Sequence, residues 1–315
     1  MNELILTYKE IDKSVDFSGV TLHGTLCLPV KTAPKKLVLM ITGSGEIDRN
    51  ENALKMQLNT FNSIAHSLAD AGIASYRFDK RGCSMSGGSY YETGFYNFVD
   101  DAQACLNTLH SFDEVSQTQI YLLGHSEGTL ISAILSTTNP KVHGQILLTP
   151  FLENMELAIE RQLQRTLAEV SALKGLKGVV VRLFIQLSGN QLSKQRKIMK
   201  RVKNTTKSTI KLKKTLINAK WLREITSIDP ASVYEKVSVP TLSIGGEKDL
   251  QCLPADSLDI KNHVAGPVET HMLSDMTHIL RIDTGEPSTF KYKALSVNPL
   301  DPRVCEIIIQ WLSGH

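Results

Sequence analysis

The sequence lacks the segments that mark a secreted or membrane-spanning protein. No apolar run approaches the roughly 18 to 20 residues that are needed to cross a bilayer. The first fifteen residues mix Glu3, Lys9, Glu10 and Lys13 with apolar residues, so they do not form the unbroken apolar core of a signal peptide. The sequence therefore predicts a cytoplasmic protein with no stable membrane insertion.

Cysteine is scarce, and its spacing excludes two kinds of site. The five cysteines are odd in number, lie far apart and form no C-x-x-C pair. This distribution argues against a disulfide framework and against a zinc site. We expect reduced thiols, no metal and no cofactor.

A strong charge imbalance is also missing. The formal net charge is +3 on 315 residues, which is too small to predict nucleic-acid binding. The chain contains no repeat, and its 42% hydrophobic content is that of an ordinary globular protein. The sequence specifies no oligomeric state. The expected partner is a small molecule, and its nature has to be inferred from the candidate site.

The chain does contain a regular alternation of strand and helix patterns. Residues 20–28 alternate in part, which predicts a half-buried antiparallel strand, and the apolar run at 36–42 predicts a parallel strand covered on both faces. Apolar residues from Leu54 to Leu68 recur at intervals of three and four residues, which predicts a helix. Further strands are predicted at 74–78, 120–123, 145–149, 241–244 and 268–273, with helices at 98–109, from Glu127 onward and at 302–312. This order indicates an α/β fold with a doubly wound, mostly parallel sheet.

One segment interrupts the alternation. Residues 153–229 are rich in helix-favouring residues, with a single strand-like run at 179–185, and they predict a helical cap inserted into a core of residues 1–152 and 230–315. Residues 194–220 contain eleven Lys or Arg and no Asp or Glu. This basic segment is either a solvated helical surface or a region that attracts an anionic substrate or an acidic surface.

The strongest chemical signal is the motif Gly124-His125-Ser126-Glu127-Gly128. It stands directly after the predicted strand 120–123 and directly before a helical pattern. A serine on a tight strand-to-helix turn projects its hydroxyl from the sheet as a nucleophile, and the flanking glycines avoid collisions with neighbouring backbone. Ser126 is therefore the predicted nucleophile.

Two backbone N–H groups are predicted to stabilise negative charge on the attacked carbonyl oxygen. The N–H of Glu127 lies at the start of a helix, where N–H groups lack internal partners. The N–H of Ser44 lies in the Gly43-Ser44-Gly45 turn after the strand at 36–42. A glycine turn that serves only the fold is the alternative for this second position.

The general base and its acid should follow the serine in proteins that carry this motif. Of the five later histidines, only His278 comes directly after a predicted strand, at the sheet edge where ligands bind. Asp249 follows the strand at 241–244 through a glycine turn, which suits a carboxylate that orients the imidazole. Asp256 and Asp275 are its rivals.

The residues beside the nucleophile have no predicted chemical step. His125 is expected to pack or hydrogen-bond beneath the turn, and the Glu127 side chain is expected to interact with the start of the helix. Neither has neighbours at metal-ligand spacing.

These motifs resemble the α/β-hydrolase superfamily, and within it bacterial esterase-like hydrolases (serine carboxylesterases). The resemblance covers residues 20–313 but hardly the cap, and it rests on Gly43-Ser44-Gly45, Asp48-Arg49, Arg77 to Gly82, Gly124 to Gly128, Gly246 to Leu250 and Thr277-His278. It implies a triad of Ser126, Asp249 and His278 with oxyanion donors at Ser44 and Glu127. Three residues depart from the common pattern: Thr42, Glu46 and Ser84. These departures bear on the geometry of the loops more than on the chemistry.

The same resemblance suggests an ion network that holds the loops around the site. Its expected members are Asp48, Arg49, Asp79 and Arg81, with a substrate role for either arginine as the alternative.

The predicted function is hydrolysis of an acyl ester through an acyl-enzyme, with the cap covering the site as a lid. A thioesterase and a small serine peptidase are alternatives, because they share the same kind of tetrahedral intermediate. A non-catalytic binding protein on the same fold is the alternative outside catalysis.

Overall fold

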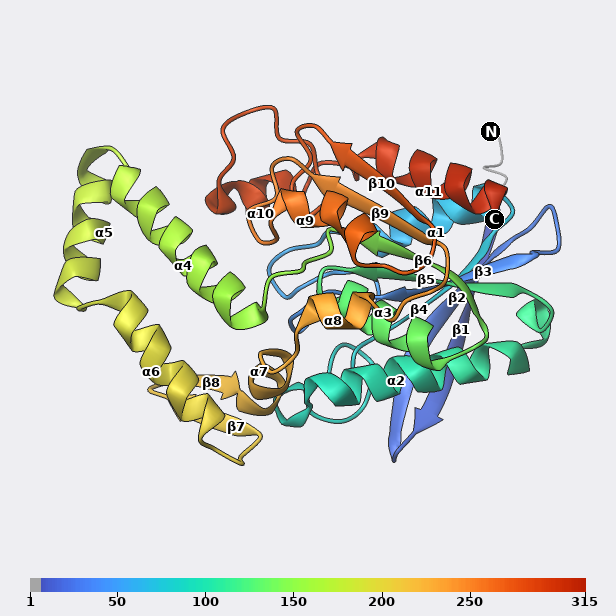
Figure 1. Ribbon diagram of the computed structural model, residues 1–315, viewed down its shortest axis with the longest axis horizontal. Coiled ribbons are helices and arrows are strands. Elements are labelled where there is room, and N and C mark those ends of the chain that lie inside the picture. The colour runs from blue at the N-terminus through green and yellow to red at the C-terminus, as the bar shows by residue number, and fades with distance from the viewer. Residues whose placement is uncertain (1–6) are drawn as a thin grey trace, which may run out of the picture.

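The computed structural model describes residues 7–315, and it contains one large twisted sheet (Figure 1). The sheet has eight strands in the order β1-β2-β4-β3-β5-β6-β9-β10. Six neighbouring strands of this order are parallel: β4, β3, β5, β6, β9 and β10. At the other edge, β1 pairs antiparallel with β2, and β2 pairs antiparallel with β4. The strands are β1 (Tyr8–Phe17), β2 (Val20–Pro29), β3 (Lys36–Ile41), β4 (Ala74–Phe78), β5 (Gln119–His125), β6 (Val142–Leu148), β9 (Thr241–Gly246) and β10 (Val268–Leu273).

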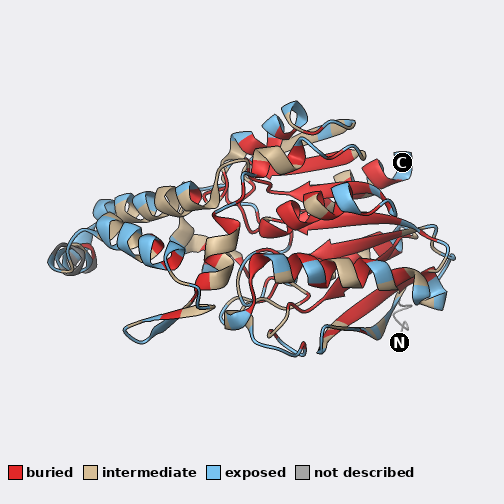
Figure 2. Cartoon of the chain, turned by 60° about the horizontal axis from the view of Figure 1, so that its bottom comes forward, coloured by how far each residue is buried: buried red, intermediate tan, exposed pale blue. Residues whose placement is uncertain are grey.

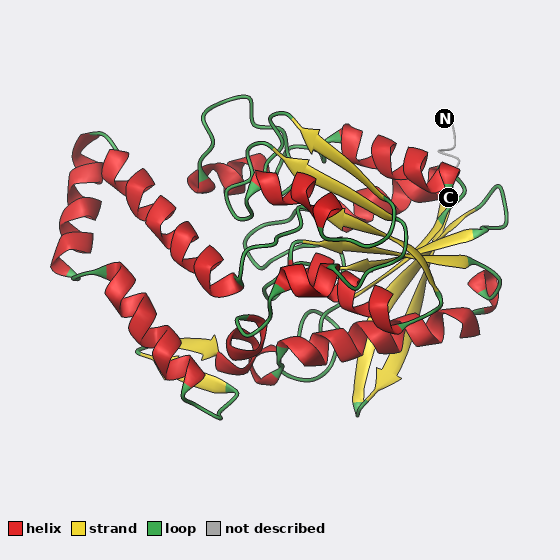
Figure 3. Cartoon of the chain, in the orientation of Figure 1, coloured by secondary structure: helices red, strands yellow, loops and turns green. Residues whose placement is uncertain are grey.

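Helices cover both faces of the sheet, as Figure 3 shows. One face packs against α1 (Thr60–Asp70) and α11 (Pro302–Gly314), and the other packs against α2 (Phe95–Thr108) and α3 (Glu127–Thr138). The short helices α8 (Pro230–Tyr234), α9 (Pro254–Asp259) and α10 (Tyr292–Leu295) complete the core. Because strands covered on both faces must be apolar throughout, the continuous run of β3 is fully consistent with its burial. The predicted doubly wound α/β fold is confirmed.

The first predicted helix begins later than its apolar spacing suggested. α1 starts at Thr60, and Leu54 lies in a loop with its side chain 94% exposed. Asn59 has a left-handed backbone (φ +49°) that ends the loop, and it exchanges two hydrogen bonds with Asn52. These side-chain bonds stabilise a loop at 47–59 in place of the first helical turns. Strand β1 was not predicted at all.

The segment between β6 and β9 projects from the core as an arm (Figures 1 and 2). It comprises α4 (Met155–Ala172), α5 (Gly175–Leu187), α6 (Gln191–Lys203), a hairpin of β7 (Thr209–Leu212) and β8 (Thr215–Asn218), and α7 (Ala219–Ile225). The strand-like run at 179–185 belongs to helix α5, and the hairpin was not predicted. We call residues 153–229 the cap. At its base the Asn154 amide donates to the carbonyls of Thr226 and Ile228, which ties the two ends of the cap together.

None of the helices within residues 7–315 is both long enough and apolar enough to span a bilayer.

Candidate active site

Ser126 occupies a sharp turn between β5 and α3. Its backbone has φ +52° and ψ −117°, a strained conformation for a residue other than glycine. A Cβ on Gly124 would lie 2.2 Å from the Gly128 carbonyl oxygen, and a Cβ on Gly128 would lie 2.1 Å from the Ile41 carbonyl oxygen. Only glycine fits at both places. The sequence motif therefore exists because the turn is packed directly against its own helix and against β3.

Asp249 and His278 form a buried pair at the same edge of the sheet. Asp249 follows β9 and His278 follows β10, and His278 Nδ1 lies 2.8 Å from Asp249 Oδ2. The other carboxylate oxygen of Asp249 accepts the backbone N–H groups of Gln251 at 2.8 Å and Cys252 at 2.9 Å. These bonds fix the carboxylate, which in turn orients the imidazole and leaves Nε2 as the nitrogen available to a substrate or a serine.

Ser126 and His278 line one cavity of about 100 Å³. Within residues 7–315, no hydrogen bond joins the hydroxyl to the imidazole. Catalytic hydrogen bonds are often long before a substrate binds, so shared lining of the cavity is the relevant observation. The structure thus brings all three predicted residues to one rim.

The rival acids have other partners. Asp256 accepts the backbone N–H groups of Leu152 at 2.9 Å and Glu153 at 3.4 Å, which places it at the base of the cap. Asp275 forms an ion pair of 2.6 Å with Lys248 at the surface. Neither has a recorded contact with His278.

The two predicted oxyanion donors have no acceptor among the described residues. These are the N–H groups of Ser44 and of Glu127, the first residue of α3. The Gly43 turn lies against the nucleophile, because a Cβ on Gly43 would be 3.3 Å from the Ser126 Cβ. The Gly43 turn therefore lies close to the serine, and Ser44 lines the same two cavities as Ser126.

Lys80 holds the peptide unit that carries the first of these donors. Its Nζ donates to the Gly43 carbonyl at 2.5 Å. That carbonyl and the Ser44 N–H belong to one trans peptide, so they point in opposite directions. A hydrogen bond that fixes the carbonyl therefore also aims the N–H.

The side chain of Glu127 has a structural role that the sequence did not reveal. It is fully buried, and its carboxylate forms an ion pair of 2.7 Å with Lys80 and accepts the indole N–H of Trp221 at 2.5 Å. Trp221 belongs to α7 of the cap. The expected interaction with the start of α3 is replaced by these two contacts, which link the core, the nucleophile turn and the cap.

A second buried acid–histidine pair lies beside the first, and sequence reasoning missed its acid. Glu51 Oε1 accepts the Gly43 N–H at 2.9 Å, and Oε2 forms an ion pair of 2.6 Å with His125 Nδ1. His125 Nε2 donates to the His278 carbonyl at 3.0 Å. The chain of contacts connects the Gly43 turn to the His278 loop. His125 does hydrogen-bond beneath the serine, as expected.

The charges of this pair shift its pKa values. Burial alone would lower the pKa of His125, but the Glu51 carboxylate outweighs it, so the pKa is raised above 6.5. Burial alone would raise the pKa of Glu51, but the His125 charge and the bonds from His125 and Gly43 hold it below 4.5. The pair is therefore ionised between these two limits.

The Glu51 pair predicts a pH-dependent stability. The raised pKa of His125 contributes stability below pH 6.5 that is lost as pH rises through the folded-state pKa, and the lowered pKa of Glu51 contributes stability that is lost as pH falls from 4.5. Urea unfolding across pH should show that Glu51→Gln lowers the free energy of unfolding most between pH 4.5 and 6.5, and less at alkaline pH. The exposed pair of Glu269 and His271 supplies the control, Glu269→Gln. A cost for Glu51→Gln that is the same between pH 4.5 and 6.5 as it is in alkali contradicts this expectation.

A larger cavity lies between the core and the cap. It has a volume of about 350 Å³ and meets the smaller cavity at Ser44, Ser126 and Gln251. Its apolar lining includes Phe151 from the core, and its walls from the cap are Met155, Ala158, Ile159, Arg161, Gln162, Trp221 and Leu222. Arg161 and Gln162 both donate to the Gln251 carbonyl, at 2.8 and 2.9 Å. The cap thus closes one side of the space around Ser126.

The expected ion network is present in part. Arg49 binds both oxygens of Asp79, at 3.1 and 2.7 Å. Arg81 pairs with Asp101 and not with Asp79. Asp48 accepts backbone N–H groups of its own loop, including that of Asn52 at 2.9 Å. Both arginines are therefore engaged in structural contacts.

Two groups of side chains bring three potential metal ligands within 4.8 Å in the described chain: Glu10, Cys27 and His66, and Asp249, Cys252 and His278. Burial raises the pKa of the Cys27 thiol to about 12 and that of the Cys252 thiol well above its usual value. A protonated thiol is a poor metal ligand. The second group is better explained by the Asp249–His278 pair.

These features define the α/β-hydrolase fold with a serine at its nucleophile turn. The chain belongs to the serine aminopeptidase S33 family, whose model matches residues 53–285, a range that includes Ser126, Asp249 and His278. It is 23% identical over 312 residues to Esterase EstD of Thermotoga maritima, covering 96% of this chain and 67% of the esterase.

Solved structures show the same fold. Est1E from Butyrivibrio proteoclasticus with bound ferulic acid has a TM-score of 0.61 and 16% identity, over 96% of this chain and 99% of Est1E. The Pyrococcus furiosus esterase Pf2001 has a TM-score of 0.56 and 13% identity, over 98% of this chain and 93% of the esterase.

Proposed function

We propose that this protein is a serine hydrolase that cleaves carboxylic esters through an acyl-enzyme. Ser126 Oγ attacks the acyl carbonyl while His278 Nε2 takes the hydroxyl proton, and Asp249 stabilises the imidazolium that forms. The N–H groups of Ser44 and Glu127 receive the negative charge of the tetrahedral intermediate. His278 then returns the proton to the leaving alcohol, and a water molecule attacks the acyl-enzyme by the reverse sequence.

The strained turn at Ser126 carries this proposal. A non-glycine residue at φ +52° costs stability, and the fold retains it where it presents a hydroxyl to the cavity that His278 also lines. A protein that only bound ligands would gain nothing from this conformation or from the buried partner of the imidazole.

The charge of the larger cavity favours an ester over the substrate of an aminopeptidase. A free α-ammonium group needs a carboxylate to bind it, but Arg161 is the charged residue in the lining of that cavity. Glu51 lines the smaller cavity and is already bound to Gly43 and His125. Arg161 is itself paired with Glu153 at 2.9 Å, so this lining suits a neutral acyl group. The cap acts as a lid that limits the size of the acyl group. The relative EstD is itself named an esterase.

A fluorophosphonate probe tests the nucleophile, and matched substrates test the reaction. The wild type should acquire one covalent adduct on Ser126, identified by peptide mass spectrometry, and hydrolyse an ester much faster than the amide of the same acyl group. Ser126→Ala should do neither. Ser132, a buried serine on the following helix, provides the control variant Ser132→Ala, which should keep the adduct. Labelling of Ser126→Ala equal to that of wild type would reject the proposal.

A further inference from the structure

The outermost helix of the cap, α5, exposes apolar side chains that nothing in the described structure covers. Val179, Val180, Val181, Leu183 and Leu187 are 54%, 63%, 38%, 55% and 79% exposed. They are five of the thirteen residues of this helix, which lies at the far end of the arm (Figure 1). Contiguous exposed apolar surface on a soluble protein marks a binding surface. These five residues are called the apolar tip.

The elements that follow the apolar tip carry a dense positive charge. Ten of the eleven Lys and Arg residues in 194–220 are exposed. Two of them pair with acids of α4, Arg196 with Glu160 and Lys203 with Glu156. The remaining eight exposed cations have no acidic partner in the part of the chain that the structure describes: Lys194, Lys197, Lys200, Arg201, Lys207, Lys211, Lys213 and Lys214. This surface is called the basic face.

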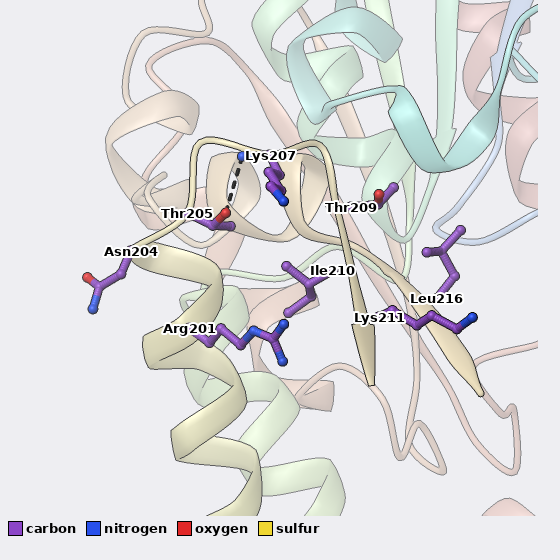
Figure 4. Close-up of a pocket in the computed structure, with 8 residues that line it drawn as sticks. All are labelled: Arg201, Asn204, Thr205, Lys207, Thr209, Ile210, Lys211 and Leu216. Carbon is purple, nitrogen blue, oxygen red and sulfur yellow. Dashed lines mark hydrogen bonds between the residues drawn. The ribbon is translucent and has the colours of Figure 1, made fainter. Parts of the chain in front are cut away.

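The basic face contains an open hollow of about 680 Å³ (Figure 4). Arg201 from α6, Lys207 from the following loop and Lys211 from the hairpin line it, together with the hydroxyl-bearing Thr205 and Thr209. The described lining includes no carboxylate. Cations and hydroxyl groups around a hollow offer the donors that a phosphate group accepts.

We propose that the cap docks on an anionic phospholipid surface, with the apolar tip among the acyl chains near the interface and the basic face on the headgroups. A helix with apolar residues beside a cluster of Lys and Arg binds membranes in this way, and each cation near an anionic leaflet strengthens the attraction. A second copy of this chain is a poorer occupant, because two basic faces would be brought together. Docking at the surface requires no membrane-spanning helix.

Vesicle flotation of the full chain tests this surface without any measure of catalysis. The wild type should float with vesicles of phosphatidylcholine mixed with phosphatidylglycerol and remain in solution with phosphatidylcholine alone. Added salt should release it, because screening weakens the attraction between exposed charges and headgroups. Binding that is equal on both vesicles, or absent from both, would overturn the proposal.

Two sets of variants separate the apolar and the charged contributions. Val180→Glu with Leu183→Glu should abolish flotation, and each of Lys197→Gln, Lys200→Gln and Lys211→Gln should lower the partition coefficient about fivefold. The controls are Val297→Glu and Lys261→Gln, exposed residues outside the cap. An unchanged midpoint of urea unfolding confirms that each variant is folded. Control variants that lose flotation as the cap variants do, or self-association that the tip variants abolish, would refute docking on lipid.

Discussion

Asp249→Asn should lower kcat by about four orders of magnitude with little change in KM. An amide in place of the carboxylate no longer accepts the Nδ1–H of His278, so the imidazole is held in the wrong tautomer and its charged form loses its partner. The substitution keeps the size of the side chain, and its oxygen still accepts from Gln251 and Cys252. The fold should therefore survive, and steady-state kinetics on a chromogenic ester measures the loss.

The matched control for this prediction is Asp275→Asn. Asp275 lies three residues from His278 in the sequence, but its side chain is 43% exposed and binds Lys248 at the surface. Its replacement should leave kcat within about twofold, since exposed ion pairs contribute little. If Asp275→Asn impairs catalysis and Asp249→Asn does not, the assignment of the acid is wrong.

The sequence located the three candidate catalytic residues because their positions follow from sheet geometry. Each of Ser126, Asp249 and His278 lies in the turn or loop that follows a strand pattern, and parallel strands bring their carboxyl ends to one edge. The glycines of the serine turn carried a further local signal. Short-range patterns were sufficient wherever the functional position coincided with the end of an element.

Glu51 could not be found in this way, because its burial depends on distant partners. It lies in a loop whose leucines, Leu54 among them, mimic helical spacing, and the bonds between Asn52 and Asn59 that fix the loop are tertiary contacts. Nothing in the local sequence indicates that a glutamate will be 3% exposed beside His125. The Asn-rich composition of residues 50–59 was the available sign that a helix would not begin there.

The hairpin in the cap was missed for a different reason. Only the first strand, Thr209 to Leu212, alternates in polarity, whereas Thr215 to Asn218 does not. Each strand also has only four residues and lies in a lysine-rich stretch. Lys213 takes a left-handed backbone at the turn, where glycine or asparagine would have been the usual signal. The valines at 179–185 suit a strand, but they occur in the helix α5, as the helical interpretation of the whole segment implied.

Lys80→Met should destabilise the protein by about 3 to 5 kcal/mol, because it removes one partner of a buried ion pair. Lys80 and Glu127 are 4% and 0% exposed, and the ammonium also lies 4.6 Å from the ring centre of Phe98. Without it, the Glu127 carboxylate keeps only the Trp221 indole as a recorded side-chain donor. Urea unfolding measures the loss of stability.

A double-mutant cycle distinguishes an uncompensated charge from a simple loss of packing. Glu127→Gln alone leaves the Lys80 charge without its acid, whereas Lys80→Met with Glu127→Gln removes both charges of this pair. The double variant should therefore be more stable than Lys80→Met. If the stability loss of the double variant equals the sum of the losses of the two single variants, Lys80 and Glu127 are not coupled. Catalysis should not recover with stability. The Gly43 carbonyl still lacks its donor in the double variant, so the Ser44 N–H is no longer aimed, and kcat should stay about a hundredfold below that of wild type.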